Sequence, residues 1–290
     1  MSTLQTTTSS TRPTSTAQAG DTYFETDTGN IIVYDGSNWR GYQYDNTTAN
    51  RYSLSFDGNG DYATTTYYQG STTQLSYSFW TKSSDTTSAM SWLAASPASG
   101  TSGGFRVISP NPSSFGFYVL VSNGSSTYTN VNVGGTGAAL DIRDGDWHHV
   151  VFSINGTSIK IWIDGGSSGS PNYTDTSSVS YVGDTTTPVH FGRNGALTSS
   201  PYYLNGYLDE IAIFDYELSA TQVGNIYNSG TPKNVGSFGL NLSPVGYWRG
   251  GDNDNGQGST VTDISGAGNN ATLSGDASIS AIGTGESIYV

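Results

Sequence analysis

The chain has 290 residues, of which only 11% are charged, and its formal net charge is −13 at pH 7. Such an acidic chain is unsuited to binding nucleic acid through its phosphates or an anionic membrane through charge. No stretch approaches the roughly 20 apolar residues of a membrane-spanning helix, and a chain with no cysteine has neither disulfides nor thiolate metal sites.

The chain opens with two segments that look like an attachment region. Residues 1–19 form a Ser/Thr-rich arm without periodicity, which we expect to be flexible and to become ordered only on a partner. The arm lacks the basic start and apolar run of a secretory signal peptide, so we expect no export by the general secretory route. Residues 20–49 predict a small β-meander, with a strand at 31–34 and a hairpin turn at Asp35-Gly36.

Residues 50–230 predict the main domain, because short alternating segments recur between turns. Tyr52, Leu54 and Phe56 alternate with serines, and the same period appears in the segment 74–83. Aromatic and β-branched residues dominate these segments, which favours strands over helices. The fold class that follows is all-β.

One short helix is expected near the end of this domain. Ser219 and Gln222 have the spacing of a capping box, and Gly230 is a candidate helix stop. Residues 231–290 then form a Gly/Asn-rich extension with brief strands near 245–248 and 260–264. This extension either wraps the main domain or forms a small separate lobe.

The stretch 144–165, "DGDWHHVVFSINGTSIKIWIDG", predicts a β-hairpin with its turn at Asn155-Gly156. Neighbouring residues on a strand point to opposite faces, so His148 and His149 cannot chelate one metal from a regular strand. We therefore expect one histidine to be hydrogen-bonded at the start of the strand and the other to lie at the surface or rim.

Four segments carry a family resemblance. The segments "YSLSFDGNGDYA", "LSYSFWTK", the hairpin above and "LNGYLDEIAIFDYELSATQVGNIYNSG" resemble, in this order, a laminin-G-like domain of the concanavalin A-like lectin/glucanase class. The resemblance covers residues 51–230 and implies an antiparallel jelly-roll β-sandwich. Residues 20–45 resemble a short module of tailed-phage virion proteins, in which Gly-Asp-x-Tyr-Phe precedes Tyr-Asp-Gly-x-x-Trp.

Carbohydrate binding would use aromatic side chains in or near loops. Each of these side chains could instead lie in the core or in an interface. The candidates are Trp92, Tyr118, Tyr128, Tyr173, Tyr202 and Tyr203.

Calcium is the cofactor that the sequence allows. Asp57, Asn59 and Asp61 offer hard oxygen ligands in one turn, and pairing of the first and last strands of the resembling family would bring Asp209 close. The alternative is an Asx turn whose carboxylates are satisfied by the local backbone.

Hydrolysis is a weaker alternative. Glucanases of the resembling class carry Glu-x-Asp-x-x-Glu on one strand. Here Glu210 is followed by Ala212 and Asp215, so the middle carboxylate is missing. Glu210 and Asp215 also have opposite parity on the strand.

Together the two resemblances imply a virion surface protein, on a fibre, an appendage or a capsid. It would be made in the host cytoplasm and would bind host surface glycans without being an enzyme. Its N-terminal region would contact other virion proteins, and a homo-oligomer, with a trimer favoured, is expected. A capsid decoration protein that binds no sugar remains the first alternative, and a polysaccharide hydrolase the second.

Overall fold

The computed structural model divides the chain into two compact units. The first unit joins residues 1–48 with 235–242, and the second joins 49–234 with 243–290. The residues that the structure describes are 5–8, 10–13, 16–25, 30–34, 36–37, 39–43, 50–97, 103–110, 116–124, 128–133, 140–177, 180–236, 240 and 242–282.

The first unit contains a four-stranded sheet in the order β1 (Gln5–Thr7), β2 (Thr22–Glu25), β3 (Asn30–Tyr34) and β4 (Trp39–Gln43). The predicted meander corresponds to β2–β4. The expectation that the arm becomes ordered only on a partner is wrong for residues 5–7, because β1 pairs in parallel with β2 of its own chain. The backbone of a Ser/Thr-rich segment can complete a sheet edge without apolar periodicity, which is why composition did not reveal this strand.

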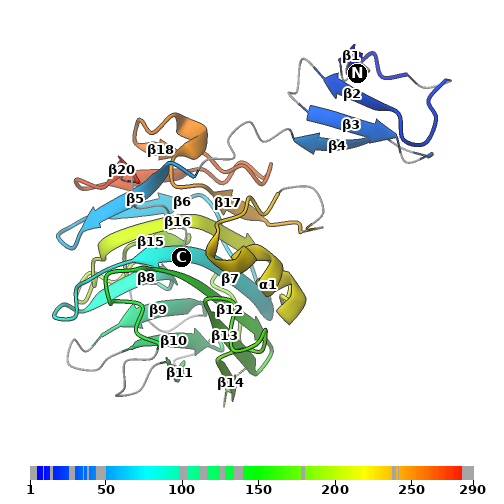
Figure 1. Ribbon diagram of the computed structural model, residues 1–290. Coiled ribbons are helices and arrows are strands. Elements are labelled where there is room, and N and C mark those ends of the chain that lie inside the picture. The colour runs from blue at the N-terminus through cyan, green and yellow to red at the C-terminus, as the bar shows by residue number, and fades with distance from the viewer. Residues whose placement is uncertain are drawn as a thin grey trace. The chain divides into compact units, whose positions relative to one another are not determined.

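The second unit is a sandwich of two eight-stranded sheets, and its strand pairs are antiparallel (Figure 1). This confirms the predicted all-β sandwich. Sheet I has the order β11 (Tyr128–Val133), β10 (Phe117–Ser122), β9 (Phe105–Ser109), β8 (Met90–Ala95), β15 (His190–Phe191), β6 (Tyr62–Thr65), β19 (Ala271–Ser274) and β18 (Thr260–Val261). Sheet II has the order β14 (Tyr173–Thr176), β13 (Ser158–Ile163), β12 (Trp147–Asn155), β7 (Gln74–Lys82), β16 (Asn205–Phe214), β5 (Tyr52–Asp57) and β20 (Ser278–Ala281), with β17 (Gly246–Trp248) beside β16.

The core between the sheets follows from the alternation of the strands. Phe152 of β12 lies opposite Tyr77 of β7 and Ile161 of β13, and all three are fully buried. Each inward row of this kind removes large apolar side chains from water, at roughly 25 cal/mol per Å² of apolar surface. On the opposite face of β13, Lys160 and Trp162 form the floor of the candidate site.

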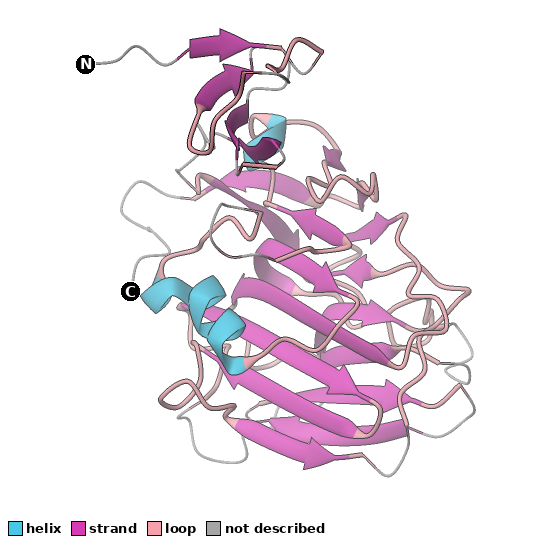
Figure 2. Ribbon diagram, turned by 90° about the vertical axis from the view of Figure 1, so that its right-hand side faces the viewer, coloured by secondary structure: helices cyan, strands magenta, loops and turns pink. Residues whose placement is uncertain are grey.

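Helix α1 (Ala220–Tyr227) lies across the outer face of sheet II (Figure 2). The capping box of Ser219 and Gln222 is present as predicted, and Val223 and Ile226 are buried. The predicted stop is wrong in detail, because the left-handed C-cap is Asn228 at φ 48°, and Gly230 follows in the 3-10 turn η1 (Asn228–Gly230). Asparagine tolerates this conformation better than most residues. Among the described residues, no helix has the length and apolarity needed to cross a bilayer.

Residues 243–282 are woven into the sandwich, and we call them the C-terminal strap. The strap adds β17 and β20 to sheet II and β18 and β19 to sheet I, with the short 3-10 turn η2 (Asp252–Asp254) between them. Asp252 accepts hydrogen bonds from the backbone of Arg51 and Tyr52 at 2.9 and 3.2 Å. Arg249 pairs with Glu210 of β16 at 2.9 Å, and both side chains are buried. Of the two alternatives, the described strap is therefore a wrapping extension.

Candidate functional site

The hairpin β12–β13 supplies the floor of a pocket on the outer face of sheet II. Ile159, Ile161 and Ile163 point into the core. By strand alternation, Lys160 and Trp162 between them point outward. The sequence pattern therefore fixes which two side chains β13 offers to a ligand.

The loop that follows β13 forms one wall. Gly166 has φ +83°, and a side chain there would collide with the carbonyl oxygen of Ser170 and with the indole of Trp162. Asn172 closes the loop by accepting a hydrogen bond from the backbone of Ile163 at 2.6 Å. Glycine at 166 thus lets the loop pack against the edge of Trp162 and places Pro171 at the rim.

The segment between β16 and α1 forms the opposite wall. The Ser76 hydroxyl donates to the carbonyl oxygen of Tyr216 at 2.7 Å and accepts from the backbone N–H of Leu218 at 3.0 Å. These bonds fix the path of residues 216–218 over β7. The capping box at Ser219 then fixes the start of α1 above Trp162.

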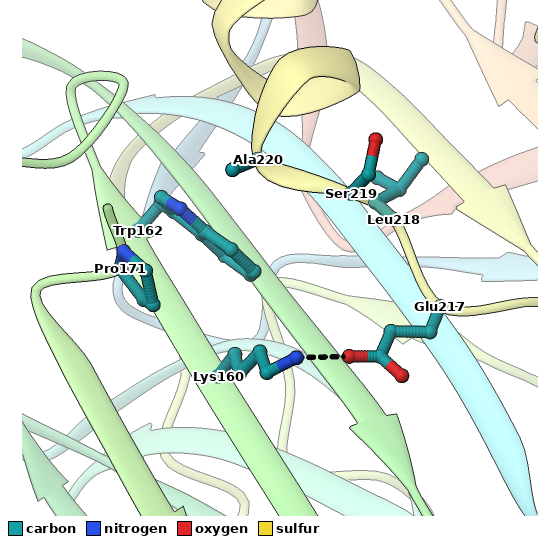
Figure 3. A pocket seen from close by; sticks show the side chains of 7 residues that line it. All are labelled: Lys160, Trp162, Pro171, Glu217, Leu218, Ser219 and Ala220. Carbon is teal, nitrogen blue, oxygen red and sulfur yellow. Dashed lines mark hydrogen bonds and ion pairs between the residues drawn. The ribbon is translucent and has the colours of Figure 1, made fainter. Parts of the chain in front are cut away.

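The pocket between these walls has a volume of about 460 Å³ (Figure 3). That volume lies within the range of roughly 300–1,000 Å³ that is usual for small-ligand sites. Apolar surface and a few polar groups share the lining. The lining residues are Lys160, Trp162, Pro171, Glu217, Leu218, Ser219 and Ala220.

The polar groups of the pocket form a donor–acceptor pair. Figure 3 shows Lys160 and Glu217 reaching toward each other, with Lys160 Nζ 2.6 Å from Glu217 Oε1. The other oxygen of Glu217 accepts a hydrogen bond from the Asn155 amide at 3.0 Å. The hydrogen bond from Lys160, with that from Asn155, lowers the pKa of Glu217. The pair is therefore ionised at neutral pH, and it presents strong donors next to strong acceptors.

Trp162 supplies the apolar floor and one unused polar atom. The residue is 2% exposed, and its Nε1–H has no hydrogen-bond partner among the described residues. Buried indole N–H groups usually find a partner, so this unpaired donor is an exception to that rule.

The pocket does not contain the paired carboxylates of a glycoside hydrolase. Glu217 is the one carboxylate among its seven lining residues, whereas glycoside hydrolysis uses two carboxyl groups on either side of the bond to be cleaved. The other acidic cluster is no better placed. Asp209 and Glu210 are buried beneath the strap, and Glu210 is held by Arg249. Burial, with the nearby charges of Glu210 and Asp252, raises the pKa of Asp209 well above its usual value.

The two adjacent histidines are separated as the alternation predicts. His149 is fully buried on the outer face of sheet II under α1, where its Nε2 lies 2.8 Å from the Ser78 hydroxyl. Burial lowers the pKa of His149 to about 4. His148 lies at the rim, 2.8 Å from Asp164 and 3.0 Å from Asp144. Burial opposes its charge, but these two carboxylates outweigh burial and raise its pKa to about 9.

The predicted aromatic residues are dispersed. Trp92 is wrong as a surface candidate, because it is fully buried in the core against Phe117. A bulge in the pairing of β8 with β9, between Ser91 and Leu93, interrupts the regular alternation there.

The tyrosines occupy several places. Tyr118 and Tyr202 are half-buried, and Tyr173 is half-buried against the core. Tyr203 is brought together with Tyr62, with ring centroids 6.4 Å apart. The side chain of Tyr128, the first residue of β11, lies outside what the structure describes.

The predicted calcium turn has the geometry of an Asx turn. Asp57 accepts from the backbone N–H of Asn59 at 2.7 Å, and Asp61 accepts from those of Asp57 and Asp276 at 3.0 and 2.6 Å. The first strand of the main domain, β5, pairs with β16 as expected, but the register places Asn205 rather than Asp209 opposite Asp57. In the described part of the chain, no group of three or more His, Asp or Glu side chains is arranged to hold a metal. Calcium binding stays a prediction.

Sequence reasoning missed Lys160, Trp162 and Glu217. Alternation along β13 is a signal for the first two, since they share the face opposite three isoleucines. Glu217 carries no local signal, because its partner lies 57 positions away in the chain. Only the path of the segment between β16 and α1 brings the two together.

Comparison with known proteins places this fold. A family model described as Laminin_G_3, Concanavalin A-like lectin/glucanases superfamily, matches residues 56–224. A search of curated proteins gave no significant match.

Solved structures give fold-level likeness. A proposed carbohydrate binding protein from Bacteroides ovatus ATCC 8483 is similar at 12% identity and TM-score 0.56, over 91% of this chain and 70% of that one. A heptameric SAP-like pentraxin from Limulus polyphemus is similar at 14% identity and TM-score 0.46, over 61% of this chain and 82% of that one. At such identities, the likeness to the first shows the fold alone.

Proposed function

The chain belongs to the concanavalin A-like lectin/glucanase superfamily, and on this premise we propose that it is a glycan-binding virion surface protein without enzymatic activity. The observation that carries the glycan-binding part is the Lys160–Glu217 pair beside the apolar floor of Trp162 and Pro171. The carbohydrate binding ascribed to the Bacteroides ovatus protein supports it at the level of the fold.

A neutral saccharide suits this pocket better than a charged ligand. Each sugar hydroxyl can both donate and accept a hydrogen bond. One of two vicinal hydroxyls can therefore accept a hydrogen bond from Lys160 while the other donates one to Glu217. The less polar face of the ring would lie against Trp162 and Pro171. A charged ligand would leave one member of the ion pair opposed by a like charge.

The test is a glycan array followed by measured dissociation constants for the best neutral ligand. We expect Glu217→Gln and Lys160→Met each to weaken binding by about 10- to 100-fold, because each removes a charge-assisted hydrogen bond. Lys82→Met is the matched control, since Lys82 lies in β7 of the same sheet and does not line the pocket.

Two outcomes would contradict the proposal. Unchanged affinity in both pocket variants would place the glycan elsewhere. A clean absence of binding across the array would favour the alternative of a decoration protein that binds no sugar. Release of reducing ends that is lost in Glu210→Gln would instead support a hydrolase.

The virion part of the proposal rests on the first unit. A four-stranded sheet in its own compact unit, together with the resemblance of residues 20–45 to a phage module, supports a role in attachment to other virion proteins. Localisation on the virion surface and a trimeric assembly belong to the same proposal.

Deleting residues 1–45 tests the attachment role. We expect the sandwich to stay folded and to lose incorporation into virions. Val235 and Leu240 are buried, and they belong to the same unit as the deleted residues. In a second truncated protein, Val235 and Leu240 are both changed to serine. Comparing the two truncated proteins distinguishes poor solubility from a loss of attachment. Full occupancy on particles after truncation would overturn the assignment.

A further inference from the structure

A second cluster of side chains lies on the outer face of sheet I. Ala63 of β6 and Phe191 of β15 point into the core and pair with each other. Their neighbours Tyr62 and His190 therefore point outward. The loop that follows β15 brings Arg193 and Tyr203 to the same place.

Two tyrosines and one arginine form the centre of this cluster, and all three are half-buried. The rings of Tyr62 and Tyr203 are stacked, with an interplanar angle of 26°. The guanidinium carbon of Arg193 lies 4.8 Å from the centre of the Tyr62 ring. A guanidinium held over an aromatic face in this way keeps its in-plane N–H groups available for an acceptor.

Arg193 carries one of the few positive charges of this acidic chain, which has 23 Asp and Glu residues against 10 Lys and Arg. Arg143 and Arg249 pair with Asp141 and Glu210 at 3.0 and 2.9 Å. Arg193 has no carboxylate partner in the described part of the chain. Its hydrogen bond to the carbonyl oxygen of Leu197 is long, at 3.5 Å, and its buried Nε has no partner among those residues.

The neighbouring groups leave the arginine as the cation of the cluster. Burial, helped by the charge of Arg193, lowers the pKa of His190 to about 4, so this histidine is neutral at pH 7. Its Nδ1–H donates to the carbonyl oxygen of Pro188 at 2.9 Å. The positive charge that a ligand meets at this face therefore comes from Arg193.

We propose that Tyr62, Tyr203 and Arg193 form a second saccharide site, selective for an acidic sugar whose carboxylate pairs with the guanidinium. Planar carboxylates match the two parallel N–H donors of arginine, and the tyrosine rings offer apolar surface to the sugar ring. The saccharide part of this ligand rests on the proposed glycan-binding function. The site itself does not depend on the pocket, because it lies on the other sheet.

The experiment titrates the full-length protein with three tetrasaccharides of equal length. They are oligogalacturonate, a sulfated galactose oligomer and the neutral galactose oligomer. We expect oligogalacturonate to bind best and its affinity to fall with added salt, because ionic strength screens the charge. Tight binding of the sulfated oligomer alone, or of all three equally, would overturn selectivity for carboxylates.

Variants locate the site. We expect Arg193→Gln to weaken oligogalacturonate binding by about 10- to 100-fold, and Arg193→Lys to restore only part of it, because lysine lacks the planar fork. Arg106→Gln is the matched control. Arg106 lies on the same face and holds the Ser96 hydroxyl at 2.7 Å, and its loss should change affinity by about twofold at most. Equal losses in both glutamine variants would mean general charge attraction and would contradict a built site.

The pocket variant Glu217→Gln separates this inference from the proposed function. Oligogalacturonate binding that survives Glu217→Gln and fails with Arg193→Gln supports the second site. Loss of oligogalacturonate binding in Glu217→Gln, with none in Arg193→Gln, would return the acidic ligand to the pocket and overturn the inference. Unfolding midpoints of every variant show whether a lost affinity reflects lost folding.

Discussion

The outer faces of the two sheets contrast in what lies over them. On sheet II, α1 lies over the outer face, Ile282 of the C-terminal strap packs against Trp80 and Trp147, and β7 is buried except at its two ends. On sheet I, Tyr62, Arg106 and Tyr118 keep part of their surface exposed. Strand alternation predicts which residues point outward from the sandwich. It does not predict whether those side chains are exposed to water or buried under another segment. Segments far away in the chain decide that.

Small hydroxyl side chains line the outer face of sheet II where the segment leading into α1 packs on it. Ser76 and Ser153 share a hydrogen bond of 2.7 Å, and Ser78 pairs with His149. When apolar and polar residues alternate along a strand, the serines are normally predicted to face solvent. Here they are buried and satisfied, and their small size leaves room for the overlying segment. These serine hydroxyls follow the rule that buried polar groups are hydrogen-bonded.

The largest expected effect is a difference in unfolding free energy between substitutions on the outer faces of the two sheets. Trp80 on the covered face is 1% exposed and stacks on Tyr227 of α1 at 5.9 Å. We expect Trp80→Ala to cost about 3–5 kcal/mol of unfolding free energy, as for other buried aromatic residues. Tyr62→Ala on the open face should cost about 1 kcal/mol, because Tyr62 is only half-buried. Urea unfolding measures both, and equal losses would remove the contrast.

A second prediction uses one histidine on each face. The pKa values of both His149 and His190 are lowered to about 4, His149 by burial and His190 by burial with the help of Arg193. Because these values lie below the unfolded value of about 6.5, each histidine favours folding above pH 6.5. That contribution is lost as the pH falls toward 4.

Arg193→Gln distinguishes the two histidines. The pKa of His190 should rise part of the way toward its ordinary value, and that of His149 should not move. NMR titration of the ring carbons measures both values in one experiment. A shift of His149 in this variant, or none of His190, would contradict the assignment of the charge effect to the open face.

The smallest expected effect is on the stability of α1, which lies over the outer face of sheet II. Ser219→Ala removes the side chain that caps α1, and we expect a loss of about 1 kcal/mol. Thr221→Ala is the matched control, because it changes an exposed residue of the same turn and leaves the cap intact. Thermal unfolding compares the two variants. If the two variants are equally stable, the capping box does not stabilise α1.

The sequence was informative wherever a local pattern decides the structure. The hairpin at Asn155-Gly156, the capping box at Ser219 and the sandwich class all followed from period and turn chemistry. Exposure was not predictable in the same way. Trp92 lies in β8, where every residue is buried, so its place between turns did not reveal that it belongs to the core.

The pairing of distant segments was also out of reach. Asp61 is satisfied by the backbone of Asp276, which comes from the strap. Glu217 meets Lys160 only because residues 216–218 are fixed over Ser76. Such contacts depend on a three-dimensional path that no periodicity encodes, and they decide where the pocket is and what its charges do.

Strand β20, the last of the domain to be synthesised, pairs with β5, the first (Figure 1). During translation, the edge of β5 therefore waits for almost the whole domain to leave the ribosome before it gains this neighbour. Pairings between such distant segments form slowly, and open strand edges of incomplete chains promote aggregation. Nascent chains that end before residue 278 should consequently depend on chaperones until synthesis is finished.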